Sequence, residues 1–250
     1  MRLPIKPPKI AYAIRREIRR MPLRRLFRKY REHTMIPKFR YVSNLELASR
    51  YRGIPGCVVE CGVWRGGMSA GLAELMGHER DYFLFDSFEG LPPASEELDG
   101  SVAAAWQRPE NLLNFRNCSA SINDADQAMR MSGARRYKLI KGWFKDTLPG
   151  FTLPDKIAIL RLDGDWYEST MVCLDHLFPH LADNALVIVD DYYAWEGCTR
   201  AVNEFVSRSR HQGVVLRLKQ FDNDVCYFER RTFPEWTPEV ELRRDLQEAR

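Results

Sequence analysis

Short apolar runs alternate with longer segments of helical periodicity through most of this chain. The runs have the length and composition of buried strands, and they predict strands at 57–61, 82–86, 137–141, 157–162, 185–189, 214–218 and 225–229. The segments between them predict helices at 45–51, 69–76, 121–131, 168–181 and 199–208. This alternation is typical of an α/β fold with a doubly wound, mainly parallel sheet. The short connection between the last two runs predicts a hairpin and hence an antiparallel sheet edge.

The stretch at 90–115 shows neither pattern. It contains Pro92, Pro93, Gly100 and Pro109. A connection of this length is uncommon in a compact domain unless it has a function. We therefore expect a loop that serves as a lid or contacts the substrate.

The first 31 residues carry the basic character of the chain. They hold 12 of its 38 lysines and arginines and a single acidic residue, so their net charge is +11 and that of the remaining chain is −7. Ile14, Ile18 and Met21 lie at helical spacing among arginines. Pro22 is expected to break this helical pattern, which resumes at Leu23.

A basic amphipathic arm of this kind has two interpretations. It can lie on an anionic membrane or bind an acidic partner. Alternatively, its apolar stripe packs against the acidic body of its own chain or of a dimer mate. The sequence leaves both open. Because the rest of the chain is acidic, we expect no nucleic-acid partner.

Length and composition favour one large domain that buries a full core. The chain has 250 residues, of which 45% are hydrophobic and 29% charged. Its six cysteines form no CxxC pair, as expected of a reduced, cytoplasmic protein. No apolar run approaches the ~20 residues of a membrane span, and the N-terminus lacks the apolar core of a signal peptide. Attachment to the inner face of a membrane through residues 1–31 remains the alternative.

Two acidic clusters directly follow two of the predicted strands. Asp163 and Asp165 come after the fourth strand, and Asp190 and Asp191 after the fifth. The carboxyl ends of neighbouring parallel strands meet at one edge, where open α/β sheets bind ligands. Four carboxylates there repel one another, which predicts a hard divalent cation among them. A role of Asp190 and Asp191 in capping the next helix explains only one of these acids.

A glycine-rich turn follows the first strand. It begins at Glu60, includes Gly62 and leads into a helix, a setting in which the backbone approaches a nucleotide-like ligand. The spacing is not GxGxxG, and Glu60 suits a cationic ligand better than a pyrophosphate. Asp86, at the end of the second strand, is placed to accept hydrogen bonds from ribose hydroxyls. The structural alternatives are a Glu60–Arg65 ion pair and an Asp86 side chain that caps the following turn.

Five segments carry a family resemblance: VECGVWRGG at 59–67, DSFEGLP at 86–92, KGWF at 141–144 with TLP at 147–149, LRLDGD at 160–165 with YEST at 167–170, and VIVDDY at 187–192. In this order they resemble the macrocin O-methyltransferase family, whose members methylate sugar hydroxyls of macrolides and aminocoumarins. The match runs from about Thr34 to about Arg208.

The resemblance implies a seven-stranded, Rossmann-like class I methyltransferase sheet, S-adenosylmethionine as donor, a Mg²⁺ ion and a homodimer. The donor-binding residues that it implies are Met35, Glu60, Gly62, Trp64, Arg65, Asp86, Ser87, Gly142, Trp143 and Asp163. It also implies Asp163, Asp190 and Asp191 as metal ligands and Asp165 as the general base. A metal bound to two vicinal sugar oxygens lowers the pKa of the acceptor hydroxyl, whose proton Asp165 then accepts.

With this resemblance, we expect the chain to consist of three segments: a basic amphipathic helical arm at 1–33, a methyltransferase domain at 34–232 and a C-terminal tail at 233–250. The expected function is metal-dependent transfer of a methyl group from S-adenosylmethionine to a sugar hydroxyl of a glycosylated natural product or glycan with vicinal hydroxyls.

Two alternatives remain. The DxD at 163–165 is also used by metal-dependent glycosyltransferases, and a non-catalytic binding protein can retain the same fold. The glycine-rich turn and the Asp190-Asp191 pair argue against the first. The four intact aspartates argue against the second.

Overall fold

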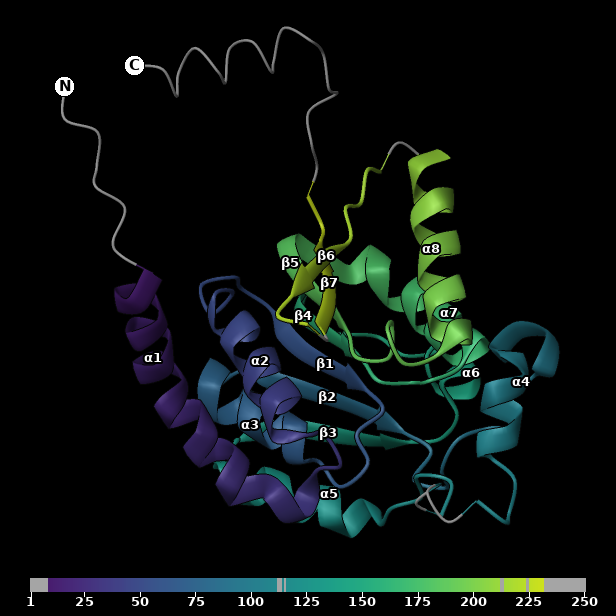
Figure 1. Ribbon diagram of the computed structural model, residues 1–250, viewed down its shortest axis with the longest axis horizontal. Coiled ribbons are helices and arrows are strands. Elements are labelled where there is room, and N and C mark those ends of the chain that lie inside the picture. Colours follow the sequence, from purple (N-terminus) through teal and green to yellow (C-terminus); the bar gives the residue numbers. More distant parts are fainter. Residues whose placement is uncertain (1–8, 112–113, 115, 212–213, 224, 232–250) are drawn as a thin grey trace, which may run out of the picture.

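A seven-stranded sheet forms the centre of the protein in a computed structural model, which describes residues 9–111, 114, 116–211, 214–223 and 225–231, with side chains from Ile14 onward (Figure 1). Its strands are β1 (Cys57–Cys61), β2 (Asp81–Asp86), β3 (Arg136–Lys141), β4 (Ile157–Leu162), β5 (Leu181–Val189), β6 (Lys219–Phe221) and β7 (Val225–Glu229). Their order is β3-β2-β1-β4-β5-β7-β6. Strands β1 to β5 are parallel, and β6 and β7 add an antiparallel hairpin. The predicted α/β fold is therefore confirmed.

Helices cover both faces of this sheet (Figure 1). They are α1 (Lys9–Tyr30), η1 (Arg31–His33), α2 (Lys38–Ser49), α3 (Gly67–Met76), α4 (Glu96–Trp106), α5 (Ile122–Ser132), α6 (Phe144–Thr147), α7 (Tyr167–Leu177), η2 (Phe178–His180) and α8 (Glu196–His211). Helices α1, α2, α3 and α5 pack together on one face, and α7 and α8 on the other.

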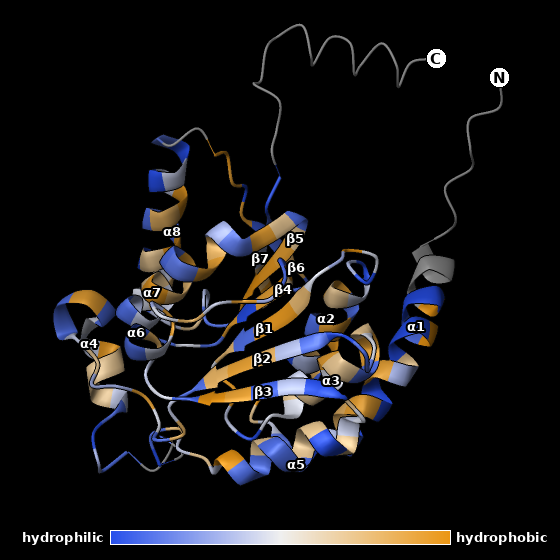
Figure 2. Ribbon diagram, turned by 180° about the vertical axis from the view of Figure 1, so that it is seen from behind, coloured by the Kyte–Doolittle hydropathy of each residue, from blue (hydrophilic) through white to orange (hydrophobic). Residues whose placement is uncertain are grey.

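The side chains of each strand point alternately into two hydrophobic cores, one on each face of the sheet. On β1, Val58 belongs to the core under α2 and α3, whereas Val59 belongs to the core under α7 and α8. Because successive side chains of a strand point to opposite faces, a strand buried on both sides is apolar at nearly every position. Figure 2 shows the central strands as the most hydrophobic part of the fold. This double burial explains why the central strands were predictable as continuous apolar runs.

Pro22 does not break the arm, contrary to the sequence-based expectation. Helix α1 continues through it without interruption. Pro22 is exposed, so water can satisfy the carbonyl that loses its intrahelical partner. Packing of Leu23, Phe27 and Tyr30 against the body stabilises the turns that follow. Tertiary contacts therefore outweigh the local cost of the proline.

Two other predictions were wrong. The stretch at 90–115 contains helix α4, which Ser95 caps by accepting a hydrogen bond from the Leu98 amide, and which Gly100 kinks at φ 83°. That kink hides the helix from periodicity analysis. The sixth strand lies at 219–221 rather than 214–218, because the turn after Phe221 aligns that residue with Val225.

Several boundaries also moved: α2 begins at Lys38, α7 ends at Leu177 and β5 begins at Leu181. Parts of the predicted segments, namely 1–8, 112–113, 115 and the tail at 233–250, lie outside the described residues. Among the helices of the described part, none combines the length and the apolarity that crossing a bilayer requires.

Candidate active site

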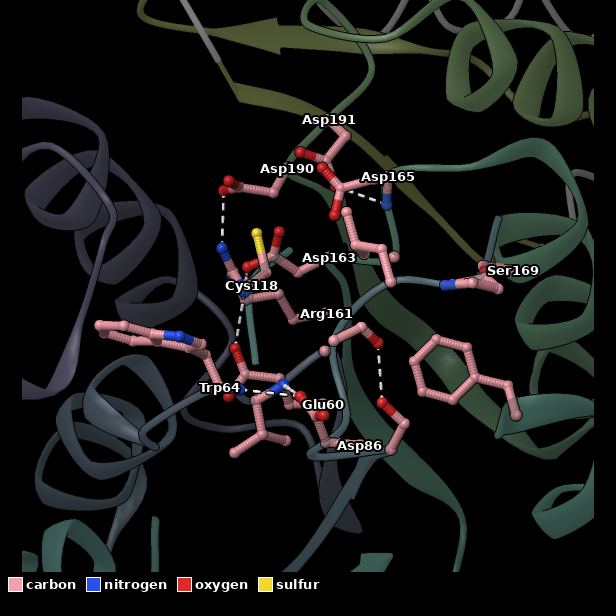
Figure 3. Close-up of a pocket in the computed structure, with 18 of the residues that line it drawn as sticks. Glu60, Trp64, Asp86, Cys118, Arg161, Asp163, Asp165, Ser169, Asp190 and Asp191 are labelled. Atoms are coloured by element: carbon pink, nitrogen blue, oxygen red, sulfur yellow. Dashed lines mark hydrogen bonds and ion pairs between the residues drawn. The ribbon is translucent and has the colours of Figure 1, made fainter. Parts of the chain in front are cut away.

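A cavity of about 870 Å³ opens at the carboxyl ends of the parallel strands. Most of the residues predicted for the site line it: Met35, Glu60, Gly62, Trp64, Asp86, Ser87, Gly142, Trp143, Asp163, Asp165, Asp190 and Asp191 (Figure 3). Arg65 lies outside the cavity, where its guanidinium stacks on the Trp64 ring at 4.6 Å and pairs with Asp124 at 3.5 Å. The structure therefore brings together every predicted site residue except Arg65.

The glycine turn is pressed against the end of β4. Gly62 has a φ of +91°, and a Cβ atom added there would lie 1.8 Å from the Asp163 carbonyl oxygen. Only glycine fits, because a side chain would collide with backbone rather than with a flexible neighbour. The Asp163 amide also donates to the Cys61 carbonyl at 2.8 Å. The glycine turn and the first acid of the acidic cluster are thus in direct contact.

Asp86 holds the shape of this turn. One of its carboxylate oxygens accepts hydrogen bonds from the amides of Val63 at 2.7 Å and Trp64 at 2.8 Å, and the other accepts one from Phe88 at 2.6 Å. Burial raises the pKa of Asp86, and these backbone donors oppose the rise. Asp86 therefore caps the following turn, as the structural alternative predicted, while it also lines the cavity.

Glu60 is fully buried and pairs with Arg161 rather than with Arg65. Its carboxylate accepts a hydrogen bond from Arg161 Nη1 at 2.7 Å and another from the Ser69 hydroxyl. Burial raises the pKa of Glu60 to about 7, and both Arg161 and Ser69 oppose that rise. The Glu60–Arg65 pair proposed as an alternative does not form.

Arg161 connects the two halves of the site. Its guanidinium is 0% exposed and lies 2.7 Å from Glu60, 2.8 Å from Asp163 and 2.7 Å from Asp190. Its Nε also donates to Asn44 Oδ1 at 3.3 Å. Sequence reasoning assigned Arg161 no role, although an arginine inside an apolar strand was a signal, since a buried cation requires anionic partners.

The acidic cluster has a different composition from the predicted metal-ligand set. Carboxylate oxygens of Asp163, Asp165 and Asp191 lie within 4.8 Å of one another. Asp190 turns toward Arg161, and its second oxygen lies 3.5 Å from Arg40 (Figure 3). Three hard oxygen donors at this spacing fit a divalent cation such as Mg²⁺.

Burial and mutual repulsion raise the pKa values of the aspartates in this cluster. Burial, with the charge of Asp163 as the next cause, raises the pKa of Asp165 to about 8. Burial also raises the pKa of Asp163 and holds that of Asp191 well above its usual range. Acids that retain protons for these reasons release them when a cation compensates their charge.

Asp165 sits in a constrained backbone. Its φ is +55°, an unusual value for a residue with a side chain, and its amide donates to Asp191 at 3.1 Å. Trp195 lies beside the Asp165 carboxyl and opposes the rise of its pKa, a neighbour that sequence reasoning missed. The Trp195 ring packs edge-on against Trp106 of α4 at 5.6 Å and Trp166 at 5.1 Å. The aromatic cluster therefore supports Asp165.

Comparison with known proteins decides the family. The model of the TylF macrocin-O-methyltransferase family matches residues 28–230. The chain belongs to the macrocin O-methyltransferase family. This confirms the resemblance, and neither the glycosyltransferase nor the non-catalytic alternative finds support, because the relatives are named as O-methyltransferases.

Individual relatives support this assignment. Demethyldecarbamoylnovobiocin O-methyltransferase of Streptomyces niveus is 34% identical over 192 residues, which cover 71% of this chain and 67% of the relative. Mycinamicin III 3''-O-methyltransferase of Micromonospora griseorubida is 33% identical over 214 residues, covering 79% and 78%. The solved structure of the O-methyltransferase NovP superposes with a TM-score of 0.66 at 31% identity, covering 80% of this chain and 83% of NovP. This protein of the macrocin family is therefore an O-methyltransferase with the Rossmann-like methyltransferase fold.

Proposed function

We propose that this protein transfers a methyl group from S-adenosylmethionine to a sugar hydroxyl of a glycosylated natural product or glycan, with the help of a divalent cation. The observation that carries the proposal is the contact between the Gly62 turn and Asp163, because it puts a donor-binding turn beside a group of acids in one cavity. A relative from Streptomyces olivaceus that is 38% identical over 167 residues supports the same class of acceptor, because it is named 8-demethyl-8-(2,3-dimethoxy-alpha-L-rhamnosyl)-tetracenomycin-C 4'-O-methyltransferase.

The donor-binding half of the cavity suits a sulfonium nucleoside. Glu60 lines the cavity with a carboxyl group that is held by Arg161 and Ser69. Asp86 fixes the turn and retains lone pairs for ribose hydroxyls, and Gly142 and Trp143 line the adenine side. Met35 lies at the cavity wall. We assign the donor to this half.

We propose Asp163, Asp190 and Asp191 as ligands for Mg²⁺, which leaves Asp165, the third acid of the cluster, free to act as a base and requires the Asp190 side chain to turn toward Asp163 and Asp191. Arg161 holds one Asp190 oxygen at 2.7 Å, whereas the other has only Arg40 at 3.5 Å and is the oxygen available to an ion. A Mg²⁺ ion held by these residues would supply Lewis-acid chemistry that lowers the pKa of the acceptor hydroxyl.

Asp165 is our proposed general base. Its carboxylate lies in the same group as Asp163 and Asp191, close enough to take a proton from a hydroxyl held there. The acceptor oxygen forms a bond to the methyl carbon as the carbon–sulfur bond breaks. S-adenosylhomocysteine leaves as a neutral thioether, and the hydroxyl proton passes to Asp165.

Calorimetric titration with S-adenosylhomocysteine, with Mg²⁺ and with a chelator, tests the donor half. We expect saturable binding in both conditions, and no binding in either would reject the proposal. Methyl transfer to a panel of glycosides with and without vicinal hydroxyls tests the acceptor half. Turnover that requires both the diol and the metal supports the mechanism, whereas equal turnover in the chelator removes the metal from it.

A further inference from the structure

The inward face of α1 is fully occupied by its own chain. Leu23 and Tyr30 are buried in the core under α2 and α3. Arg20 donates to Glu46 at 2.6 Å and also pairs with Asp222. These contacts fix which side of the helix faces the protein, so the opposite side has no partner among the residues that the structure describes.

The outward face of α1 presents an apolar stripe to solvent. Ile14, Ile18 and Met21 are 55%, 60% and 52% exposed. They lie at i, i+4 and i+7 and therefore form one line along the helix. Helix α1 runs along the rim of the molecule in both orientations (Figures 1 and 2). Packing on the body thus accounts for the second half of the arm and leaves this stripe unexplained.

Basic side chains surround the stripe. Arg15, Arg19, Arg25 and Arg28 are exposed, and they form no ion pair within the described part of the chain. Glu17, the one acid of α1, is already paired with Arg24 at 2.6 Å. The outward face is therefore strongly positive, and a complementary occupant must be anionic.

We propose that this face of α1 docks on an anionic phospholipid surface. Ile14, Ile18 and Met21 would enter the boundary between headgroups and acyl chains, and the four arginines would contact lipid phosphates. Interfacial helices combine such a stripe with a basic border, and each cation near an anionic surface adds to the attraction.

A second copy of this chain fits the face less well. Two-fold association through one face puts the same arginines against each other, which repels. Three apolar side chains also supply little of the ~800 Å² per partner that stable protein interfaces bury. An anionic membrane attracts the arginines instead of repelling them. It also needs no minimum interface area, because each inserted side chain adds separately to the binding free energy.

Helix α1 leads directly into the active site. It continues through η1 to Thr34 and Met35, and these residues with His33 line the cavity. A docked α1 would therefore hold the cavity in a fixed orientation relative to the lipid surface. This inference does not depend on the proposed methyl acceptor.

Sedimentation of the full-length protein with vesicles tests the proposal. We expect binding to phosphatidylcholine vesicles that contain phosphatidylserine, weakening at high salt, and little binding to phosphatidylcholine alone. The variant I14S/I18S/M21S should bind at least about tenfold more weakly. The matched control V102S/M131S removes two exposed apolar side chains elsewhere, Val102 on α4 and Met131 on α5, and should bind like the wild type.

Four outcomes would overturn the proposal. They are no binding of the wild type to anionic vesicles, equal binding by the triple-serine variant, a smaller oligomer of that variant in gel filtration, and tighter binding to polyglutamate than to vesicles. The third result assigns the face to a second copy of the chain, and the fourth assigns it to an acidic protein. Unchanged S-adenosylhomocysteine binding by each variant shows that it is folded.

Discussion

Glu60 and Arg161 are register partners on the neighbouring strands β1 and β4, and their side chains meet at 2.7 Å with no exposure to solvent. Glu60 belongs to the half of the cavity that we propose for the donor, and Arg161 also contacts Asp163 and Asp190 in the acidic half. A single guanidinium therefore fixes both halves relative to each other.

Replacement of Arg161 should be strongly destabilising. The Arg161→Met variant leaves three acids around a missing cation, and breaking a buried ion pair from one side costs roughly 3–5 kcal/mol. We expect a loss of that size in the free energy of unfolding measured with urea. Arg200→Met is the matched control, because Arg200 is exposed and, among the described residues, donates only to the backbone carbonyl of Glu97. Equal stability of the two variants would contradict the role of Arg161.

Asp165→Asn should abolish turnover without affecting the donor. The amide cannot accept a proton at neutral pH, and losing a general base lowers the rate by about 10²–10⁴-fold. S-adenosylhomocysteine affinity, measured by calorimetry, should stay unchanged because Asp165 lies in the acidic half. Asp183→Asn, at an exposed position on β5, is the control. Turnover that survives in Asp165→Asn would move the base to another residue.

Trp195→Phe should lower kcat by roughly tenfold while donor affinity and Tm change little. The substitution keeps an aromatic ring beside Trp106 and Trp166 but removes the N–H group next to Asp165. Trp166→Phe is the matched control. It removes an indole N–H of the same aromatic cluster, but this N–H donates to the Pro92 carbonyl at 2.9 Å rather than lying beside Asp165. If both variants lose the same activity, Trp195 contributes only through packing and its N–H group has no role in catalysis.

Gly62→Ala should disrupt donor binding and stability together. The added Cβ collides with the Asp163 backbone, and the φ of +91° is unfavourable for alanine. Gly53→Ala should be harmless, because nothing lies within 4 Å of a Cβ at that position. Calorimetry and thermal unfolding of both variants check this contrast. Normal donor affinity in Gly62→Ala would show that the turn tolerates a side chain.

Stability in the absence of metal should fall as pH rises from about 4.5 to about 7. Burial raises the pKa of Glu60 to about 7 in the folded state from 4.5, so over this range the unfolded chain loses a proton that the folded chain retains. The fall attributable to Glu60 is at most about 3 kcal/mol. Urea unfolding in a chelator across this range should show a shallower slope for Glu60→Gln. If the wild type and Glu60→Gln show the same slope of unfolding free energy against pH, the pH dependence comes from the aspartates.

The sequence predicted most accurately the strands that are buried on both faces of the sheet. Strands β1 and β4 are apolar on both faces except at Glu60 and Arg161, so their limits and their order along the chain were clear from pattern alone. The ends of those strands then located Glu60, Gly62 and Asp163 at one edge. The family resemblance added roles to these residues that spacing could not provide.

The missed features depend on contacts between distant segments. The direction of the Asp190 side chain follows from Arg161 and Arg40, and the pairing of Glu60 follows from strand register. Pro22 remains helical because Leu23 and the residues after it pack against the body. None of these outcomes has a local signature, which is why pattern analysis did not reveal them.

The central position of β1 also governs how the chain acquires its fold during synthesis. One edge of β1 pairs with β2 soon after it leaves the ribosome, but the other edge must wait for β4, whose Arg161 follows Glu60 by 101 residues. Until then an apolar strand edge stays open, a state that favours slow folding and aggregation. Production of this enzyme should therefore benefit from slow translation or from chaperones that shield nascent strands.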